Sequence, residues 1–179
     1  NSIIEDSEGD LWYGTNNGIS LQESKTGKWH SYLSTFENVQ NSKNHIFTTL
    51  CEVSPGIIWA GGYFSGIYQI DKRTSKTTYF TPALYAREDI RPDKYIRDIR
   101  KDSHGYIWTG GYYNLKRINV QTKDIRLYHG LHSVTAIIEK DDKSMWIGTA
   151  TGLHLLDKES GKFERIQLPV ESVSYTHLR

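Results

Sequence analysis

The sequence predicts an all-β chain made of about four four-stranded antiparallel blades of a β-propeller. The main observation is a Trp-x-Gly motif that occurs four times, at Trp12, Trp59, Trp108 and Trp146. The tryptophans are 47, 49 and 38 positions apart, close to the roughly 40–50 residues of a propeller blade. Similar turn residues also accompany each copy. Recurrence at a nearly fixed period indicates one supersecondary unit stacked several times.

Each repeat begins with a run rich in β-branched residues, which predicts its first strand. These runs occupy residues 2–6, 46–50, 95–99 and 133–138. A tight polar turn follows, at 7–10 in the first repeat and 103–105 in the third. Its glycine allows the positive φ of a short hairpin. The segment that contains the tryptophan is then the second strand.

The rest of each repeat predicts two more strands joined by a second polar turn. The third strands are expected at 18–21, 66–70, 114–118 and 152–156, and the turns at 25–28, 73–76, 121–124 and 159–162. Every fourth strand contains an aromatic residue: Trp29 and Tyr32, Tyr79 and Phe80, Tyr128, and Phe163. Four antiparallel strands make one blade, and the predicted blades span 1–33, 45–81, 94–129 and 132–168.

The tryptophans are expected to form the core. Because side chains alternate along a strand, each Trp and the Gly two residues later share one face. A blade between two neighbours buries both faces, so the Trp fills the gap and the Gly leaves room for a side chain of the adjacent blade. We therefore expect all four tryptophans to be core residues and not sugar-stacking residues.

Composition excludes several classes of function. The 179 residues carry a net charge of +1, without the basic patch that nucleic-acid binding requires. The only cysteine, Cys51, leaves no internal disulfide and no multi-cysteine metal site. No run approaches the roughly 18 apolar residues of a membrane-spanning helix. We expect a globular chain that binds no nucleic acid.

Residues 3–19 resemble the two-component regulator propeller repeat, and residues 157–163 resemble the linker that follows it. The resemblance covers residues 1–168 and is strongest in the first and fourth copies. It implies the periplasmic sensor of a hybrid two-component histidine kinase, of the kind that Bacteroidetes use to detect glycan fragments. Such sensors generally contain two seven-bladed propellers, a β-sandwich and a transmembrane helix. The expected parent is a homodimer anchored in the inner membrane.

The resemblance also implies that this chain is a piece of a larger protein. Four repeats would form an arc of an expected seven-bladed propeller, in contact with neighbouring blades and domains of the parent. Residues 169–179 do not look native, and from Ser172 onward they resemble a translated sequencing adapter. A natural tail with this sequence is the alternative.

A ligand site is expected where the loops between second and third strands meet the links between blades. Aromatic rings stack on apolar sugar faces, and Arg binds hydroxyls or carboxylates. The candidate residues for binding an oligosaccharide or another small ligand are Tyr63, Phe64, Tyr85, Arg87, Tyr112 and Tyr113. The alternative is that these aromatics pack under the long links. The charged link 81–94 either contacts a ligand or partner or is merely solvated.

The sequence predicts no catalytic residue, cofactor or metal for this chain. The turn 6–10 lacks the ligand spacing of a calcium loop, and His129 with His132 gives only a weak zinc signal. Two alternatives to the sensor remain open. A propeller lyase or glycosidase would use carboxylates at the first strands, near Glu5, Glu52, Asp98 and Glu139. A pure interaction scaffold is the other alternative.

Overall fold

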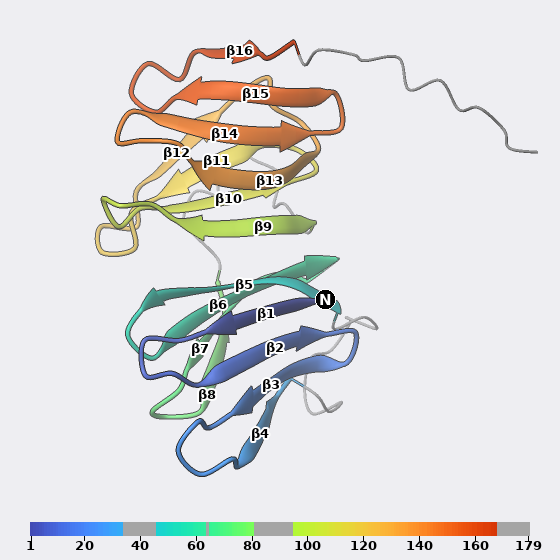
Figure 1. The fold of residues 1–179 in the computed structure, drawn as a ribbon, viewed down its shortest axis with the longest axis vertical. Helices are drawn as coiled ribbons and strands as arrows, with labels where there is room; N and C mark the ends of the chain where they lie inside the picture. The colour runs from blue at the N-terminus through green and yellow to red at the C-terminus, as the bar shows by residue number, and fades with distance from the viewer. Residues whose placement is uncertain (34–45, 64, 81–94, 168–179) are drawn as a thin grey trace, which may run out of the picture.

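The computed structural model describes residues 1–33, 46–63, 65–80 and 95–167. These residues form four antiparallel sheets of four strands each, with strands ordered as in the sequence (Figure 1). The predicted all-β fold class is confirmed. No helix long and apolar enough to cross a membrane occurs in the described part of the chain.

Each sheet is one blade, and its strands follow the predicted repeat. Blade 1 contains β1 (Ser2–Glu5), β2 (Leu11–Thr15), β3 (Gly18–Gln22) and β4 (Trp29–Tyr32). Blade 2 contains β5 (Ile46–Ser54), β6 (Ile57–Tyr63), β7 (Gly66–Asp71) and β8 (Lys76–Tyr79). Blade 3 contains β9 (Ile96–Lys101), β10 (Ile107–Gly111), β11 (Leu115–Ile118) and β12 (Ile125–Tyr128). Blade 4 contains β13 (Val134–Glu139), β14 (Ser144–Thr149), β15 (Gly152–Asp157) and β16 (Phe163–Arg165).

Neighbouring blades pack through their inner strands. Figure 1 shows the sheets stacked in chain order, from blue β1–β4 at the bottom to orange β13–β16 at the top. Strand β5 contacts β1 and β2, β9 contacts β5 and β6, and β13 contacts β9 and β10. The first strand of each blade therefore forms most of the contact with the blade before it.

Three of the four tryptophans fill the gaps between blades, as predicted. Trp12, Trp59 and Trp108 are completely buried. Each lies in an apolar cluster shared with the following blade; Trp108, for example, clusters with Val134 and Ile137 of β13. These clusters are the core of the structure.

The glycine two residues after each of these tryptophans is needed for the close approach of the next blade. A Cβ on Gly110 would lie 2.3 Å from Val134 Cγ1, and one on Gly61 would lie 2.5 Å from Ile96 Cγ2. At Gly14 the closest atom is Phe47 O, at 3.1 Å. The expectation that these glycines make room for the adjacent blade is confirmed.

The expectation that Trp146 is also a core residue is wrong. Its side chain is only half-buried, and Lys140 Nζ lies 5.4 Å from the centroid of its ring. Blade 4 contacts blade 3 through β13, whereas Trp146 faces away from that boundary and joins none of the buried clusters of the described residues. Its partner surface would be a following blade, so the repeat pattern alone overstates its burial.

A buried aspartate secures both the hairpin and the tryptophan of blade 1. Asp6 accepts hydrogen bonds from Glu8 N (3.0 Å), Asp10 N (2.9 Å) and Trp12 Nε1 (2.9 Å). Lys72 of blade 2 inserts its ammonium group between the carboxylates of Asp6, Glu8 and Asp10, at 2.6–2.8 Å. The side chain that holds Trp12 is thus also an ion-pair partner across the blade boundary.

The boundary between blades 3 and 4 repeats this arrangement. Asp102 accepts from Trp108 Nε1 at 2.8 Å, and Lys158 of blade 4 lies 3.9 Å from the Asp102 carboxylate. Lys158 also pairs with Glu139, which accepts two further hydrogen bonds from Ser103. An aspartate and a lysine therefore recur at matching positions of the repeat, with Asp102 lying 96 positions after Asp6 and Lys158 lying 86 positions after Lys72.

The boundary between blades 2 and 3 replaces the ion pair with apolar side chains. Val53 occupies the aspartate position and is buried, and Val120 occupies the lysine position and packs against the same cluster. Without an aspartate, Trp59 Nε1 donates instead to Gln69 Oε1 at 3.1 Å. The aspartate and the lysine are thus both replaced at this boundary, so neither a lone anion nor a lone cation faces an apolar side chain there.

We expect the burial difference between tryptophans to appear in stability. Trp108→Ala removes a fully buried ring and should lower the free energy of unfolding by about 3–5 kcal/mol. Trp146→Ala serves as the matched control and should cost clearly less, because its ring is only partly buried. Urea unfolding of both variants measures this. Equal losses would contradict the assignment of Trp146 to an uncovered face.

The ion pairs also make stability depend on pH. Burial alone would raise the pKa of Asp6, but hydrogen bonds from Lys72 and Trp12 outweigh burial and lower the pKa below its usual 3.8. The pKa of Glu139 is lowered below 4.5 in the same way, because Lys158 and Ser103 outweigh burial. Such carboxyls stabilise the fold above their unfolded-state pKa and lose that contribution as pH falls through the folded-state pKa.

Stability should therefore stay nearly constant from about pH 5 to neutral and decrease below about pH 4. The carboxylates outweigh burial at Lys72 and raise its pKa, so its own contribution is lost only well above pH 10.5. Lys72→Met should cost about 3–5 kcal/mol at neutral pH, since it leaves buried Asp6 without its cation. Urea midpoints across a pH series test both statements, and a midpoint unchanged down to pH 3 would refute the first.

Candidate functional site

Four tyrosines of blades 2 and 3 form a row at the end of the blades where second-to-third-strand loops emerge. Tyr63 ends β6, Tyr95 directly precedes β9, and Tyr112 and Tyr113 follow β10. The ring centroids are 6.3 Å apart for Tyr63 and Tyr95, 6.1 Å for Tyr95 and Tyr112, and 5.0 Å for Tyr112 and Tyr113. We call these four residues the tyrosine row.

Hydrogen bonds to backbone carbonyls hold the tyrosine row in place. Ser133 N donates to Tyr112 O at 3.0 Å, and His132 Nδ1 donates to Tyr113 O at 2.7 Å. Ser65 Oγ donates to Tyr63 O at 3.0 Å. The row is therefore anchored by its own loop and by the link that enters blade 4.

The tyrosine row presents apolar ring faces together with hydroxyl groups. Tyr63 is 38% exposed and Tyr112 is 51% exposed, whereas Tyr95, which lies between them, and Tyr113, which lies beyond Tyr112, are half-buried. Neighbouring rings are strongly tilted or perpendicular, so edges and faces alternate along the row. Exposed aromatic rings with a polar tip suit a ligand that is apolar on one face and hydroxylated at its edge.

Sequence reasoning found three members of this row and missed the fourth. The structure brings together the predicted candidates Tyr63, Tyr112 and Tyr113. Phe64, Tyr85 and Arg87 lie outside the described residues, as do the links 34–45 and 81–94 and the tail from 168. Tyr95 was missed because its place at the start of a first strand marked it as structural, although first strands begin at the same end as the candidate loops.

The same end of blades 1 and 4 is polar and not aromatic. Asn1 Nδ2 donates to Asn16 Oδ1 at 2.6 Å, and the hydroxyls of Thr149 and Thr151 lie 3.0 Å apart. The aromatic surface at this end is thus concentrated, within the described residues, on the boundary between blades 2 and 3.

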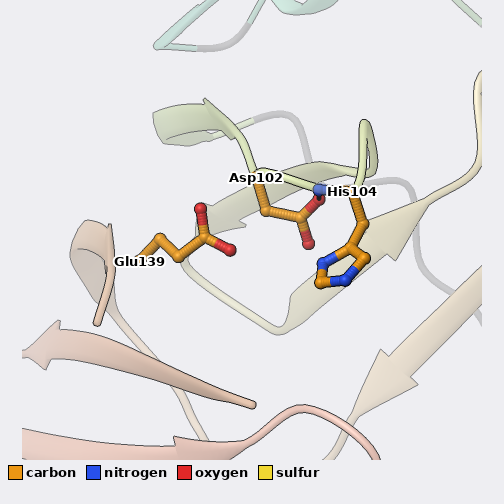
Figure 2. A group of neighbouring side chains, drawn as sticks. All are labelled: Asp102, His104 and Glu139. Atoms are coloured by element: carbon orange, nitrogen blue, oxygen red, sulfur yellow. Dashed lines mark hydrogen bonds between the residues drawn. The ribbon is translucent and has the colours of Figure 1, made fainter. Parts of the chain in front are cut away.

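The opposite end of the blades holds a cluster with metal-ligand chemistry. Figure 2 shows Asp102, His104 and Glu139 pointing toward one another, with one potential ligand atom of each within 4.8 Å of the others. Asp102 already accepts from His104 N, Tyr106 N and Trp108 Nε1, and both acids pair with Lys158. A metal ion would have to displace this lysine. Asp102 and Glu139 therefore serve in the ion pair between blades 3 and 4, and this role competes with metal binding.

A cavity of about 490 Å³ adjoins this cluster at the boundary of blades 3 and 4. Arg117 stacks over Tyr106 at 4.6 Å, and Arg126 donates to Lys158 O at 3.3 Å. Tyr128 Oη donates to the same carbonyl at 2.8 Å. The cavity is also lined by Asp142, Asp157 and Glu159, so its cations and anions balance one another. The lining residues therefore give the cavity no net charge that would favour an anionic or a cationic ligand.

The carboxylates that would mark an enzyme have structural contacts instead. Glu52 accepts from Ser7 N (2.8 Å) and Ser7 Oγ (2.9 Å) across the boundary of blades 1 and 2. Asp98 accepts from Ile137 N of blade 4 at 2.7 Å. Glu139 makes the equivalent contact with Ser103 and Lys158. Three of the four named carboxylates therefore connect blades, and Glu5 is exposed at the end of β1.

The thiol of Cys51 is not activated. Burial raises its pKa to about 11, so it stays protonated at neutral pH, where a nucleophilic cysteine would need a thiolate. It packs at the edge of the cluster around Trp59.

Comparison with known proteins supports the fold and the repeat. Residues 1–17 match the model of the two component regulator propeller. A chain described as the extracellular domain of a hybrid two component system, BT3049 from B. thetaiotaomicron, superposes with a TM-score of 0.72 and 22% identity. The similarity covers 93% of this chain and 21% of that one. A search of curated proteins found no match.

Two further solved structures share the fold. The extracellular domain of the system BT4673 from B. thetaiotaomicron gives a TM-score of 0.69 at 21% identity, over 93% of this chain and 24% of that one. PorZ, a surface component of the type-IX secretion system of Porphyromonas gingivalis, gives 0.66 at 22%, over 96% and 27%. This chain thus spans a fifth to just over a quarter of each. It consists of four β-propeller blades, the first of which matches the two component regulator propeller repeat.

Proposed function

We propose that this chain is part of a periplasmic sensor that binds an oligosaccharide at the tyrosine row. In this proposal the parent protein is an inner-membrane-anchored homodimer, and binding is relayed to a histidine kinase. The observation that carries the binding half is the row itself, because it places four aromatic rings on one exposed surface. Rings with polar tips are suited to sugars, whose faces are apolar and whose edges carry hydroxyls.

The relay half of the proposal is supported by the relatives. Two of the three structures described above are extracellular domains of systems described as hybrid two component systems. PorZ shares the fold and belongs to a secretion system, so the fold by itself does not select a sensor. The two component regulator propeller match of residues 1–17 favours the sensor.

The position of the row gives binding a route to the rest of the propeller. Tyr63 belongs to blade 2, Tyr112 belongs to blade 3, and the carbonyl of Tyr112 is bonded to the link into blade 4. A ligand across the row contacts two blades at once. It would favour whichever blade arrangement it binds more tightly, which is the only way in which binding shifts a conformational equilibrium.

Ligand binding is tested by thermal and urea unfolding of the chain with a panel of oligosaccharides. A true ligand at 100 times its dissociation constant should add about 2.7 kcal/mol to the free energy of unfolding. Tyr112→Ala should weaken that binding about 2- to 12-fold, equivalent to ~0.5–1.5 kcal/mol for one aromatic contact.

Trp29→Ala is the matched control, since Trp29 is 56% exposed on the outer strand of blade 1, away from the row. It should leave binding unchanged. The binding proposal fails if no oligosaccharide stabilises the chain, or if both variants weaken binding equally. New reducing ends or unsaturated sugars in the panel would instead favour the enzyme.

The relay is tested on the parent gene. Its reading frame should encode a transmembrane helix followed by a histidine-kinase core downstream of these blades. A parent that ends in a propeller without either segment would contradict the relay and leave the binding site as a separate question.

A further inference from the structure

A β-bulge recurs at one position in the first strand of the blades. Gly61 and Gly62 pair with Thr49 and Phe47, which leaves Thr48 as the extra residue of β5. The same irregularity leaves Arg97 extra in β9 and Thr135 extra in β13. Bulges redirect a side chain out of the regular alternation and are frequent beside functional sites.

In the first two blades the side chain at this position binds a backbone carbonyl of the following blade. Thr48 Oγ1 donates to Ile96 O at 3.1 Å. Asn1 lies eleven residues before Trp12, as Thr48 lies eleven before Trp59, and its Nδ2 lies 3.3 Å from Phe47 O. The position therefore normally carries a donor that is used to join two blades.

Arg97 holds the same position in blade 3, but no hydrogen bond joins its guanidinium to a backbone carbonyl of blade 4 among the described residues. The Nε atom of Arg97 is buried and has no hydrogen-bond partner among the described residues, although the side chain as a whole is only half-buried. An unpaired buried donor is costly, and it is costlier when the group is charged. Native structures rarely retain one without a bound water, ion or ligand.

The backbone of Arg97 also lies beside the tyrosine row. It follows Tyr95 by two residues, which is roughly 6.6 Å along a strand. Its neighbour Ile96 pairs with Gly111, the residue before Tyr112. Blade 1 shows that side chains at these two positions can touch. Asn1 corresponds to Arg97, and Asn16 corresponds to Tyr112, since each lies four residues after the tryptophan of its blade. Asn1 Nδ2 donates a hydrogen bond to Asn16 Oδ1.

We propose that Arg97 binds the anionic group of an acidic oligosaccharide whose rings lie on the tyrosine row. The guanidinium matches a carboxylate or sulfate through two parallel hydrogen bonds. This inference rests on the proposed function and adds to it the charge of the ligand: the site selects sugars with uronate or sulfate groups over neutral sugars.

The test compares matched pairs of probes on the chain. One pair is tetragalacturonate and its carboxyl-reduced form, and the other is a heparin tetrasaccharide and its desulfated form. At least one acidic probe should bind, and its neutral counterpart should bind about 10- to 100-fold more weakly. The pair that responds distinguishes carboxylate from sulfate as the recognised group.

Three variants separate the role of Arg97 from a general effect of charge. Arg97→Gln should reduce affinity for the acidic probe to that for the neutral one, and Arg97→Lys should retain part of the difference because it keeps the charge. Arg100→Gln makes the same charge change in β9, at a residue paired with Asp98, and should leave binding unchanged. Unfolding midpoints verify that each variant is folded.

The results distinguish this inference from the function on which it rests. Equal binding of acidic and neutral probes, or an Arg97→Gln variant that binds the acidic probe normally, would overturn the inference. If only neutral oligosaccharides bind, and Tyr112→Ala weakens them, the oligosaccharide site stands and the anion site does not. If no oligosaccharide binds, both fall.

Discussion

The structure depends on one contact, in which the tryptophan of each blade packs on the first strand of the next. The contact requires a glycine two residues later, because any side chain at Gly61 or Gly110 would overlap Ile96 or Val134. The same strand therefore supplies both the large side chain and the gap to one boundary, the boundary with the following blade. A blade therefore has little core of its own and is stable only in a stack.

Around this common contact, each boundary has its own chemistry. Blades 1 and 2 are joined by Asp6 and Lys72, and blades 3 and 4 by Asp102 and Lys158, whereas Val53 meets Val120 between them. Buried ion pairs add little net stability compared with well-packed apolar groups, but separating one partner from the other is costly. The alternation therefore favours the native order of blades, since a charged position beside a valine would be left unpaired.

The repeats allowed the strands, the inter-blade tryptophans and their glycines to be predicted, because all of these recur at fixed spacing. What did not recur could not be predicted. Lys72 pairs with a residue 66 positions earlier, and no local pattern links the two. Tyr95 joined the row only when two blades were placed side by side. Trp146 carried the same motif as the other tryptophans, yet its burial depends on a neighbouring blade and not on its own sequence.

The distribution of these boundary contacts bears on how the proposed sensor would respond to a ligand. The tyrosine row lies over the boundary between blades 2 and 3, the one described boundary that has valines in place of the aspartate and lysine. Where the valines lie, this boundary is held by non-directional apolar contacts and lacks charged hydrogen bonds. Neutral hydrogen bonds still join its two blades, from Thr48 Oγ1 to Ile96 O and from Ile99 N to Thr49 Oγ1. A ligand that bridges Tyr63 and Tyr112 would contact both blades of this boundary. It would do so at the end of the blades opposite to Val53 and Val120. The proposed site therefore lies over the one described boundary that has no ion pair between its blades, where a ligand could shift blade packing without separating such a pair.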